Sequence, residues 1–388
     1  MKFAERTYKI KQSLTRKLFD LAKSYDDVVD LTLGDPDLSP CNEIKLAACD
    51  SIIKGDTHYS SNAGLYEARK AIADFSSARY SINIDASNVL ISVGGMESLF
   101  LLLYSLLDKD DEVVMFSPCY VNYVQMTLLC DAKPIVIPFA DNDFNIDFDK
   151  LNDCITDRTK VIIINNPCNP TGKVLSVDIL RRISEIAIKN DLFVISDEVY
   201  SSLVYEKPFC SICQLNGMKD RLAIVDSMSK RYSMTGYRLG YSICNEELIN
   251  CMTKVQENVV ACAPLQSQYA AIEAYGKTIS NEYVKSEFMK RRDYVIERIR
   301  QNKMLKISSI DSAFYAFVDI SKSNMKSLDF SMKLLKTNHV AVVPGITYGD
   351  DCDAYVRIAF TKNVDILRNA FDKIDDFTDR LMKGDLDD

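Results

Sequence analysis

Lys230 is the residue of this sequence whose setting most directly suggests covalent chemistry. It follows the apolar run RLAIVDS (221–227) in the segment Met228-Ser229-Lys230, and Arg238 comes eight residues later. A lysine that is partly desolvated beside another cation has a lowered pKa, and its neutral amine can attack a carbonyl carbon. A Ser-Lys pair by itself is usually a solvated surface feature, so the argument for Lys230 depends on its surroundings.

Asp197 ends a second apolar run, LFVISD (192–197), and is followed by Glu198, Val199 and Tyr200. A carboxylate at the end of a buried strand is unfavourable unless a cation or several hydrogen bonds compensate it. Two interpretations are open. Asp197 could cap the next helix, or it could pair with a protonated ring nitrogen of a ligand.

Two other loops also follow apolar runs. Gly94 and Gly95 come after NVLISV (88–93) and precede a helical stretch. Because glycines allow a tight turn and a helix start offers free N–H groups, this junction suits an anion such as phosphate, although a turn that binds nothing explains it equally well. KVIIIN (160–165) is followed by NPCNPTG (166–172), whose prolines make a rigid loop and whose X-Pro bonds can be cis. This loop could present the Asn169 amide accurately, or form a tight surface turn.

The elements that must position these residues recur as short apolar runs separated by helical stretches. Seven runs of this kind are present: 88–93, 112–117, 134–139, 160–165, 192–197, 221–227 and 238–244. Runs that are apolar on both faces predict an α/β fold, with a mostly parallel seven-stranded sheet flanked by helices. Ligands bind beyond the carboxyl ends of such strands, which is where the four loops lie.

The two ends of the chain follow a different pattern. After Pro264 we expect a helical region from 265 to about 303, and then strands at 313–320, 339–345 and 354–360. We therefore predict a large domain over residues 46–285. A smaller α+β domain is expected from residues 1–45 and 286–388.

Composition narrows the classes of function. The net charge of −8 argues against nucleic acid as a partner, because phosphate binding needs clustered Lys and Arg. The longest apolar run, 99–107, is far shorter than the ~20 residues that a membrane span needs. The N-terminus lacks the pattern of a signal peptide, so we expect a cytoplasmic protein. The twelve cysteines are scattered, with CxxC spacing only at Cys210 and Cys213, and we expect no metal site.

Taken together, these loops resemble the motifs of class I/II aminotransferases of the aspartate aminotransferase superfamily, which are pyridoxal-phosphate enzymes of fold type I. The motifs appear in that family's order over nearly the whole chain: LTLGDPD (31–37), HYSSNAG (58–64), SVGGMES, SPCYVNY, NPCNPTG, SDEVY, SMSKRYSMTGYRLG and VRIAF.

The resemblance implies a catalytic role for three residues. Lys230 would form the Schiff base with pyridoxal 5′-phosphate and then act as general base and acid. Asp197 would keep the pyridinium nitrogen protonated. Tyr200, together with Asn169, would bond the phenolic oxygen of the cofactor.

The resemblance also implies binding roles. The phosphate would be held by the backbone of Gly95 and Met96 and by Ser227, Ser229 and Arg238. Tyr120 would stack on the cofactor ring, in a protein that contains no tryptophan, and Tyr123 stands where some relatives have histidine. Arg357 would clamp the substrate α-carboxylate, with Gly34 and Asn169 beside it. Tyr59 would reach the phosphate of a neighbouring subunit, which implies a homodimer with shared active sites.

The expected reaction moves the amino group of an L-amino acid to a 2-oxo acid such as 2-oxoglutarate. Aspartate is the leading donor and would need a second cation, for which Arg16, Lys17 and Arg231 are candidates. An aromatic or other neutral amino acid would instead use an apolar pocket, for which the candidates are Leu18, Phe19 and Tyr66. Other possibilities are β-elimination as a C–S lyase and, more remotely, a cofactor-binding regulator.

Overall fold

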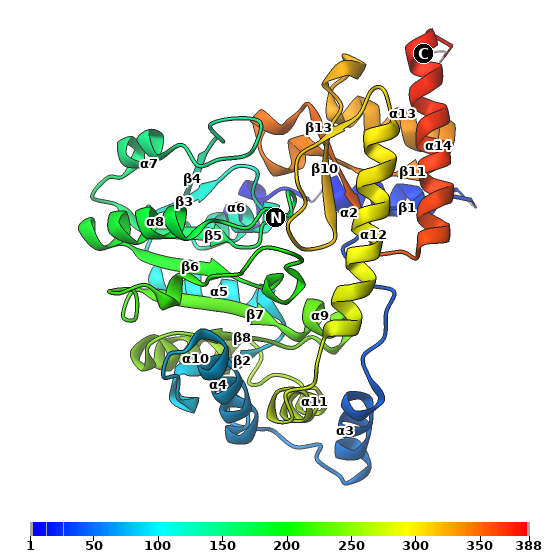
Figure 1. Ribbon diagram of the computed structural model, residues 1–388. Helices are drawn as coiled ribbons and strands as arrows, with labels where there is room; N and C mark the ends of the chain where they lie inside the picture. The colour runs from blue at the N-terminus through cyan, green and yellow to red at the C-terminus, as the bar shows by residue number, and fades with distance from the viewer. Residues whose placement is uncertain (1–2, 13, 26, 386–388) are drawn as a thin grey trace.

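The computed structural model describes residues 3–12, 14–25 and 27–385 and has a seven-stranded sheet at its centre (Figure 1). Its strands are β2 (Val89–Ser92), β3 (Glu112–Phe116), β4 (Lys133–Ile137), β5 (Thr159–Asn165), β6 (Phe193–Asp197), β7 (Leu222–Ser227) and β8 (Gly240–Ile243). The strand order is β2-β8-β7-β6-β5-β3-β4. Only β8 is antiparallel to its neighbours, so the prediction of a mostly parallel seven-stranded sheet is confirmed.

Helices cover both faces of this sheet. On one face lie α3 (Asn42–Ile53), α4 (Tyr66–Tyr80), α7 (Phe148–Cys154), α8 (Val177–Lys189) and α11 (Leu265–Gly276). On the other lie α5 (Gly95–Leu106), α6 (Val121–Leu129) and α10 (Glu246–Val259). Successive strand residues alternate between these faces: Ile162 and Ile164 pack on the first, and Val161 and Ile163 on the second. Burial on both sides explains why the strands are apolar throughout.

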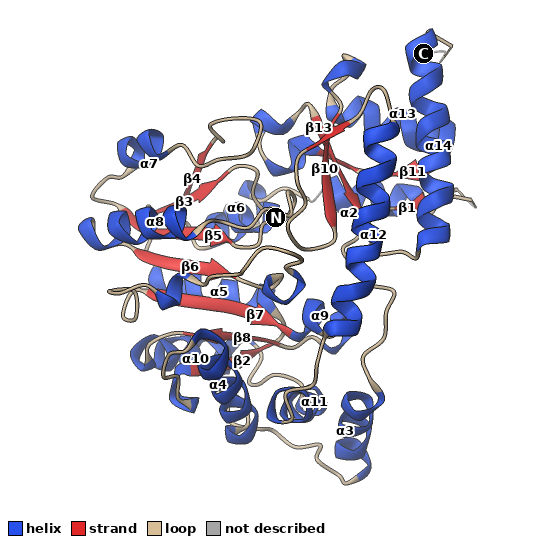
Figure 2. Ribbon diagram, in the orientation of Figure 1, coloured by secondary structure: helices blue, strands red, loops and turns tan. Residues whose placement is uncertain are grey.

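A second, antiparallel sheet lies beyond the carboxyl ends of the central strands (Figure 2). It consists of β9 (Lys306–Ile307), β10 (Tyr315–Asp319), β12 (Val343–Pro344) and β13 (Tyr355–Ala359), in the order β12-β13-β10-β9. Around it pack α12 (Glu282–Gln301), α13 (Ser327–Asn338) and α14 (Val364–Lys383). The strands predicted at 313–320 and 354–360 are present as β10 and β13. The strand predicted at 339–345 is divided into β11 (Val340–Ala341), which belongs to a separate two-stranded sheet, and β12.

The N-terminal residues reach this second sheet. β1 (Val29–Asp30) pairs in parallel with β11 (Val340–Ala341). Two helices precede it, α1 (Arg6–Lys9) and α2 (Leu14–Ala22), and Leu18 of α2 packs against Leu335. The boundaries predicted at 45/46 and 285/286 fall inside α3 and α12, and the division into two domains stays a prediction.

The helical region expected from 265 to about 303 is present but is not one continuous helix. Instead α11 ends at Gly276 and α12 begins at Glu282. Thr278 adopts a left-handed backbone with φ of 49°, and the amides of Lys277, Thr278 and Ile279 bond back to carbonyls of α11. These bonds satisfy the last carbonyls of the helix and end it. The residues between the two helices include no proline, so the sequence pattern alone does not indicate a break there.

Short helices complete the chain. They are α9 (Met228–Arg231) and the 3₁₀ turns η1 (Ala86–Asn88), η2 (Ser201–Leu203), η3 (Ile212–Gln214), η4 (Thr235–Tyr237), η5 (Ser321–Ser323), η6 (Gly345–Tyr348) and η7 (Asp350–Cys352). Within the described ranges, none of the helices is both long enough and apolar enough to span a bilayer.

Candidate active site

A cavity of about 470 Å³ lies at the carboxyl ends of β5, β6 and β7 and is closed by residues of the second sheet. Its volume is typical of a site for a small molecule. Every site residue predicted from the sequence except Tyr59 lines it: Gly34, Gly95, Met96, Tyr120, Asn169, Asp197, Tyr200, Ser227, Ser229, Lys230, Arg238 and Arg357. The register of the sheet explains part of this convergence, because Asn165 pairs with Asp197 and Asp197 with Val225.

Lys230 lies on the one-turn helix α9 and extends into the cavity. Its Nζ donates a hydrogen bond of 2.6 Å to the carbonyl oxygen of Gly34. Burial lowers the pKa of Lys230 to about 8; Arg357 and Arg238 act in the same direction, and Asp35 and Asp197 oppose them. At pH 7 about one-tenth of an amine with this pKa is neutral and nucleophilic, far more than for an ordinary lysine.

Asp197 is 5% exposed at the end of β6. Burial raises the pKa of its carboxyl to about 6, and a hydrogen bond of 2.6 Å from the Tyr123 hydroxyl to Oδ2 works against that rise. The Val199 amide donates to Oδ1 at 3.3 Å. Of the two interpretations of Asp197, the cavity-facing one agrees with its place among the lining residues.

Arg357 enters the cavity from β13 and is 4% exposed. Its Nη1 donates to Asn169 Oδ1 at 3.1 Å, its Nη2 donates to the Thr32 carbonyl, and its guanidinium lies 4.4 Å from the ring centre of Tyr315. The Nε is buried and has no hydrogen-bond partner within the described part of the chain. A buried guanidinium with a free donor is suited to a planar anion such as a carboxylate.

Tyr315 and Asn165 are lining residues that the sequence reasoning missed. The Tyr315 hydroxyl lies 3.0 Å from the Tyr200 hydroxyl, and Asn165 Oδ1 accepts from the Asn169 amide at 2.7 Å. Asn165 ends a recognised strand, so its position was a usable signal. Tyr315 belongs to a segment far along the chain, and only the packing of the second sheet brings it here.

The loop Asn166–Gly172 contains two cis peptide bonds, Asn166-Pro167 and Asn169-Pro170. Its backbone is tied to the neighbouring strand, because the Asn166 amide donates to the Asp197 carbonyl at 3.0 Å. The structure thus holds the Asn169 amide in the cavity, which a free surface turn would not.

The opposite end of the cavity is rich in hydrogen-bond donors. α5 begins at Gly95, after Gly94 in a conformation with φ of +82°. A Cβ on Gly94 would lie 2.4 Å from Nη2 of Arg238, so the missing side chain lets the guanidinium approach the helix start. Ser227 and Ser229 line the same cavity from the end of β7 and from α9. A helix N-terminus beside an arginine and two hydroxyls fits a phosphate group.

Tyr120 stands at the wall of the cavity, immediately before α6. Asn122 Nδ2 donates to its hydroxyl at 2.9 Å, and its ring meets the Tyr123 ring edge to face, with centres 5.6 Å apart. These contacts hold a flat aromatic surface at the wall of the cavity.

The residues considered for substrate choice do not line the cavity. Arg231 is buried on the far face of the sheet, and Arg16 pairs with Asp20 at 3.6 Å. Lys17 is exposed, Leu18 of α2 packs with Leu335 and Ala341, and Tyr66 is 58% exposed. The side chain of Phe19 lies outside what the structure describes. The cations that line the cavity, among described residues, are Lys230, Arg238 and Arg357.

The comparison with known proteins agrees with this geometry. A family model described as "Aminotransferase class I and II" matches residues 26–374. The chain belongs to this family. Among curated proteins, this aminotransferase is 34% identical over 380 residues to an aspartate aminotransferase of Pyrococcus horikoshii, with 96% of each chain covered. It is 33% identical over 390 residues to aromatic-amino-acid aminotransferase 2 of Thermococcus litoralis, covering 99% of this chain and 98% of that one.

A solved structure of a related enzyme has the same fold. The crystal structure of an aspartate aminotransferase from Thermotoga maritima superposes with a TM-score of 0.93 at 32% identity, covering 97% of this chain and 100% of the other. As a member of the family, the protein is a transaminase that uses pyridoxal 5′-phosphate. Two observations fit that cofactor: the donors around Gly94 suit its phosphate, and the amine of lowered pKa suits its aldehyde.

Proposed function

We propose that this aminotransferase transfers the amino group of an L-amino acid to a 2-oxo acid such as 2-oxoglutarate, with Lys230 as the residue that binds the cofactor covalently. The observation that carries the proposal is the meeting of an amine, a carboxyl and a guanidinium from three distant segments in one cavity: Lys230, Asp197 and Arg357. When bound, pyridoxal phosphate supplies an aldehyde that bonds amines and a protonated ring that withdraws electrons from Cα.

The proposed proton transfers belong to two side chains. Once the substrate amine has displaced it, Lys230 Nζ would remove the proton from the substrate Cα and deliver it to the former aldehyde carbon of the cofactor, since a pKa near neutrality allows transfer in both directions. Asp197 would hold a proton at the ring nitrogen, and the bond from Tyr123 fixes its orientation. Tyr200 and Asn169 would donate hydrogen bonds to the phenolic oxygen of the cofactor.

The proposed binding groups occupy the two ends of the cavity. The amides of Gly95 and Met96, with the side chains of Ser227, Ser229 and Arg238, would hold the phosphate. At the other end, Arg357 would bind the α-carboxylate through its free donor, beside Gly34 and Asn169. Tyr120 would stack on the ring and help to exclude water.

The charges of the cavity favour a substrate with an uncharged side chain over aspartate. Each of the three lining cations already has a proposed role, and Asp35 adds a negative charge that would repel a second carboxylate. The relatives named above are an aspartate aminotransferase and an aromatic-amino-acid aminotransferase, so both classes of donor are candidates. A panel of aspartate, phenylalanine, tyrosine and leucine as donors to 2-oxoglutarate, followed by glutamate formation, decides between them. With a cysteine S-conjugate as substrate, steady release of pyruvate, ammonia and the thiol without glutamate formation would indicate β-elimination instead.

The central experiment is an absorbance scan of the purified protein after addition of pyridoxal phosphate. Wild-type protein should show a visible absorption band, and Lys230→Ala should abolish it. Lys219→Ala, which changes an exposed lysine, should retain the band. A variant at Lys230 that keeps the wild-type band would show that another residue carries the cofactor.

We also propose that the enzyme is a homodimer in which Tyr59 completes the site of the neighbouring subunit. Tyr59 is 88% exposed and lies outside the cavity of its own chain. Apolar side chains of α3 are exposed beside it in the sequence, with Ile53 81% and Ile52 56% accessible. Surfaces of this kind are typical of subunit interfaces.

Mixed dimers test the shared site. Tyr59→Ala and Lys230→Ala subunits would each be impaired as homodimers. Mixed together, they should regain part of the activity, because one of the two sites in a hybrid then has both residues intact. No recovery in hybrids that light scattering shows to form would contradict the proposal.

A further inference from the structure

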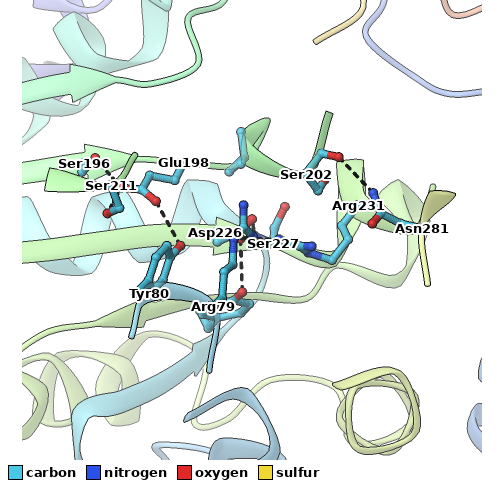
Figure 3. Close-up of polar contacts among 12 residues, drawn as sticks. Arg79, Tyr80, Ser196, Glu198, Ser202, Ser211, Asp226, Ser227, Arg231 and Asn281 are labelled. Atoms are coloured by element: carbon cyan, nitrogen blue, oxygen red, sulfur yellow. Dashed lines mark hydrogen bonds and ion pairs between the residues drawn. The ribbon is translucent and has the colours of Figure 1, made fainter. Parts of the chain in front are cut away.

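A buried layer of charged and polar side chains lies on the face of the central sheet opposite the cavity (Figure 3). It follows from strand alternation, since neighbouring residues point to opposite faces. Ser227 lines the cavity, whereas the preceding Asp226 is 1% exposed on the far face. Lys230 lines the cavity, whereas the following Arg231 is 5% exposed and reaches the same layer.

Asp226 is the centre of this layer. Its Oδ1 accepts a hydrogen bond of 2.7 Å from the Ser227 amide, and its Oδ2 accepts one of 3.2 Å from the Tyr241 hydroxyl. Nη2 of Arg231 lies 3.5 Å from Oδ2, and Nη1 of Arg79 lies 4.0 Å from the same atom. Asp226 therefore accepts a hydrogen bond from the backbone of Ser227, which lines the cavity. It also pairs with Arg231, the residue that follows the cavity residue Lys230.

The Asp226–Arg231 pair spans α9 from end to end. Asp226 precedes the helix by two residues, and Arg231 is the last residue of the helix. A helix of four residues is too short to be stable alone, because nucleation is unfavourable and few bonds repay it. The N-cap residue Ser227 makes no side-chain cap bond. Contacts outside the helix must therefore fix this turn.

Fold stability by itself does not account for such a pair. A buried ion pair loses much of its Coulomb gain to desolvation, and apolar replacements of similar size are often tolerated. The geometry here has a more specific consequence, because the segment between the two charges carries Ser227, Ser229 and Lys230.

We propose that Asp226 and Arg231 are positioning residues that clamp α9 from behind the sheet, so that Ser227, Ser229 and Lys230 face the cofactor. This inference rests on the proposed function, in which those three residues bind pyridoxal phosphate. Neither Asp226 nor Arg231 lines the cavity, so both act through the residues that they hold.

The first test is cofactor affinity. Apoprotein of Asp226→Asn and of Arg231→Met is titrated with pyridoxal phosphate, and the visible band gives the dissociation constant. Both variants should bind the cofactor about tenfold more weakly than wild type. The matched control is Arg292→Met, because Arg292 is also an ion-paired arginine that is 5% exposed but does not line or back the cavity. It should keep the wild-type affinity.

The second test separates position from simple charge. In cofactor-free protein, the rate at which an amine-reactive reagent labels Lys230 is measured against pH. The charged groups facing Lys230 are Asp35, Asp197, Arg238 and Arg357. Burial lowers the pKa of Lys230 to about 8, which is the labelling midpoint expected for the wild type. Removing the negative charge of Asp226 would lower the midpoint by Coulomb's law alone. If α9 loosens and Lys230 becomes hydrated, the midpoint should rise by about one pH unit instead.

The outcomes distinguish this inference from the proposed function. A wild-type protein without a visible band contradicts the proposed function. A normal wild type, with Asp226→Asn showing wild-type affinity or an unchanged or lowered midpoint, overturns only the positioning role. If Asp226→Asn does not fold by circular dichroism, Arg231→Lys takes its place: it keeps the charge beside Lys230, so an upward shift supports positioning and an unchanged midpoint overturns it.

Discussion

The Lys230 amine donates a hydrogen bond of 2.6 Å to the carbonyl oxygen of Gly34, which lies 196 residues earlier in the chain. This bond joins the N-terminal loop 31–37 to the lysine proposed to bind the cofactor. The contact needs glycine at position 34, because an added Cβ would lie 1.8 Å from the hydroxyl oxygen of Tyr315.

Gly34→Ala should therefore lower kcat/KM at least about tenfold, since either the loop or Tyr315 must move and Arg357 packs on that ring. Gly276→Ala is the matched control, because its new Cβ would meet its nearest atom at 3.9 Å, an ordinary contact. Steady-state kinetics and thermal melting of both variants check the result. Equal kcat/KM in the Gly34 variant and wild type would show that the close packing has no role.

Tyr123→Phe should move the acidic limb of the pH profile of kcat/KM to higher pH. The Tyr123 hydroxyl stabilises the ionised form of Asp197, so its removal raises the pKa of that carboxyl, which burial already raises to about 6. The shift should be about one pH unit. Tyr104→Phe, which changes a tyrosine that is 52% exposed, should leave the profile unchanged. An acidic limb that does not move would show that the ionisation of Asp197 does not limit activity at low pH.

Arg357→Lys should raise KM for α-amino acid donors about 100-fold, because lysine lacks the planar fork that binds a carboxylate. An amine without a carboxylate, such as 1-phenylethylamine, should be affected little by the same change. Arg300→Lys, at an exposed position of α12, serves as the control. Measurement of kcat and KM for the two classes of donor checks the prediction. It is wrong if KM rises equally for the amino acids and for the amine that lacks a carboxylate.

Glu198→Gln should flatten the pH dependence of stability between about pH 4.5 and 7. Burial raises the pKa of Glu198 to about 7, against hydrogen bonds from Ser211, Ser196 and Tyr80. A raised carboxyl pKa stabilises the fold below the ordinary value of 4.5, and this contribution is lost as the pH rises through the folded value. The loss is about 3 kcal/mol at most. Urea unfolding at pH 5 and pH 8 should show a smaller difference for Glu198→Gln than for wild type. Glu257→Gln, at an exposed position, should keep the wild-type difference.

The local pattern of the sequence was sufficient to predict the central sheet. Runs such as KVIIIN are apolar on both faces, which only a strand covered by helices on both sides satisfies, and all seven runs form strands. The order of these strands also explains why the loops after β5, β6 and β7 meet, since parallel strands place their carboxyl ends at one edge. The roles given to the individual site residues and the domain boundaries stay predictions.

What the sequence by itself determined, then, is local: the strands, the loops that follow them and the types of side chain that those loops carry. The tertiary structure alone decided which distant residues share the cavity. It brings in Tyr315, leaves Arg16 and Lys17 outside, and turns Arg231 to the far face of the sheet. It also ends α11 at Gly276. The physical reason is that hydrophobic periodicity records whether a residue is buried, whereas its partner across the fold depends on how the sheets and helices pack together.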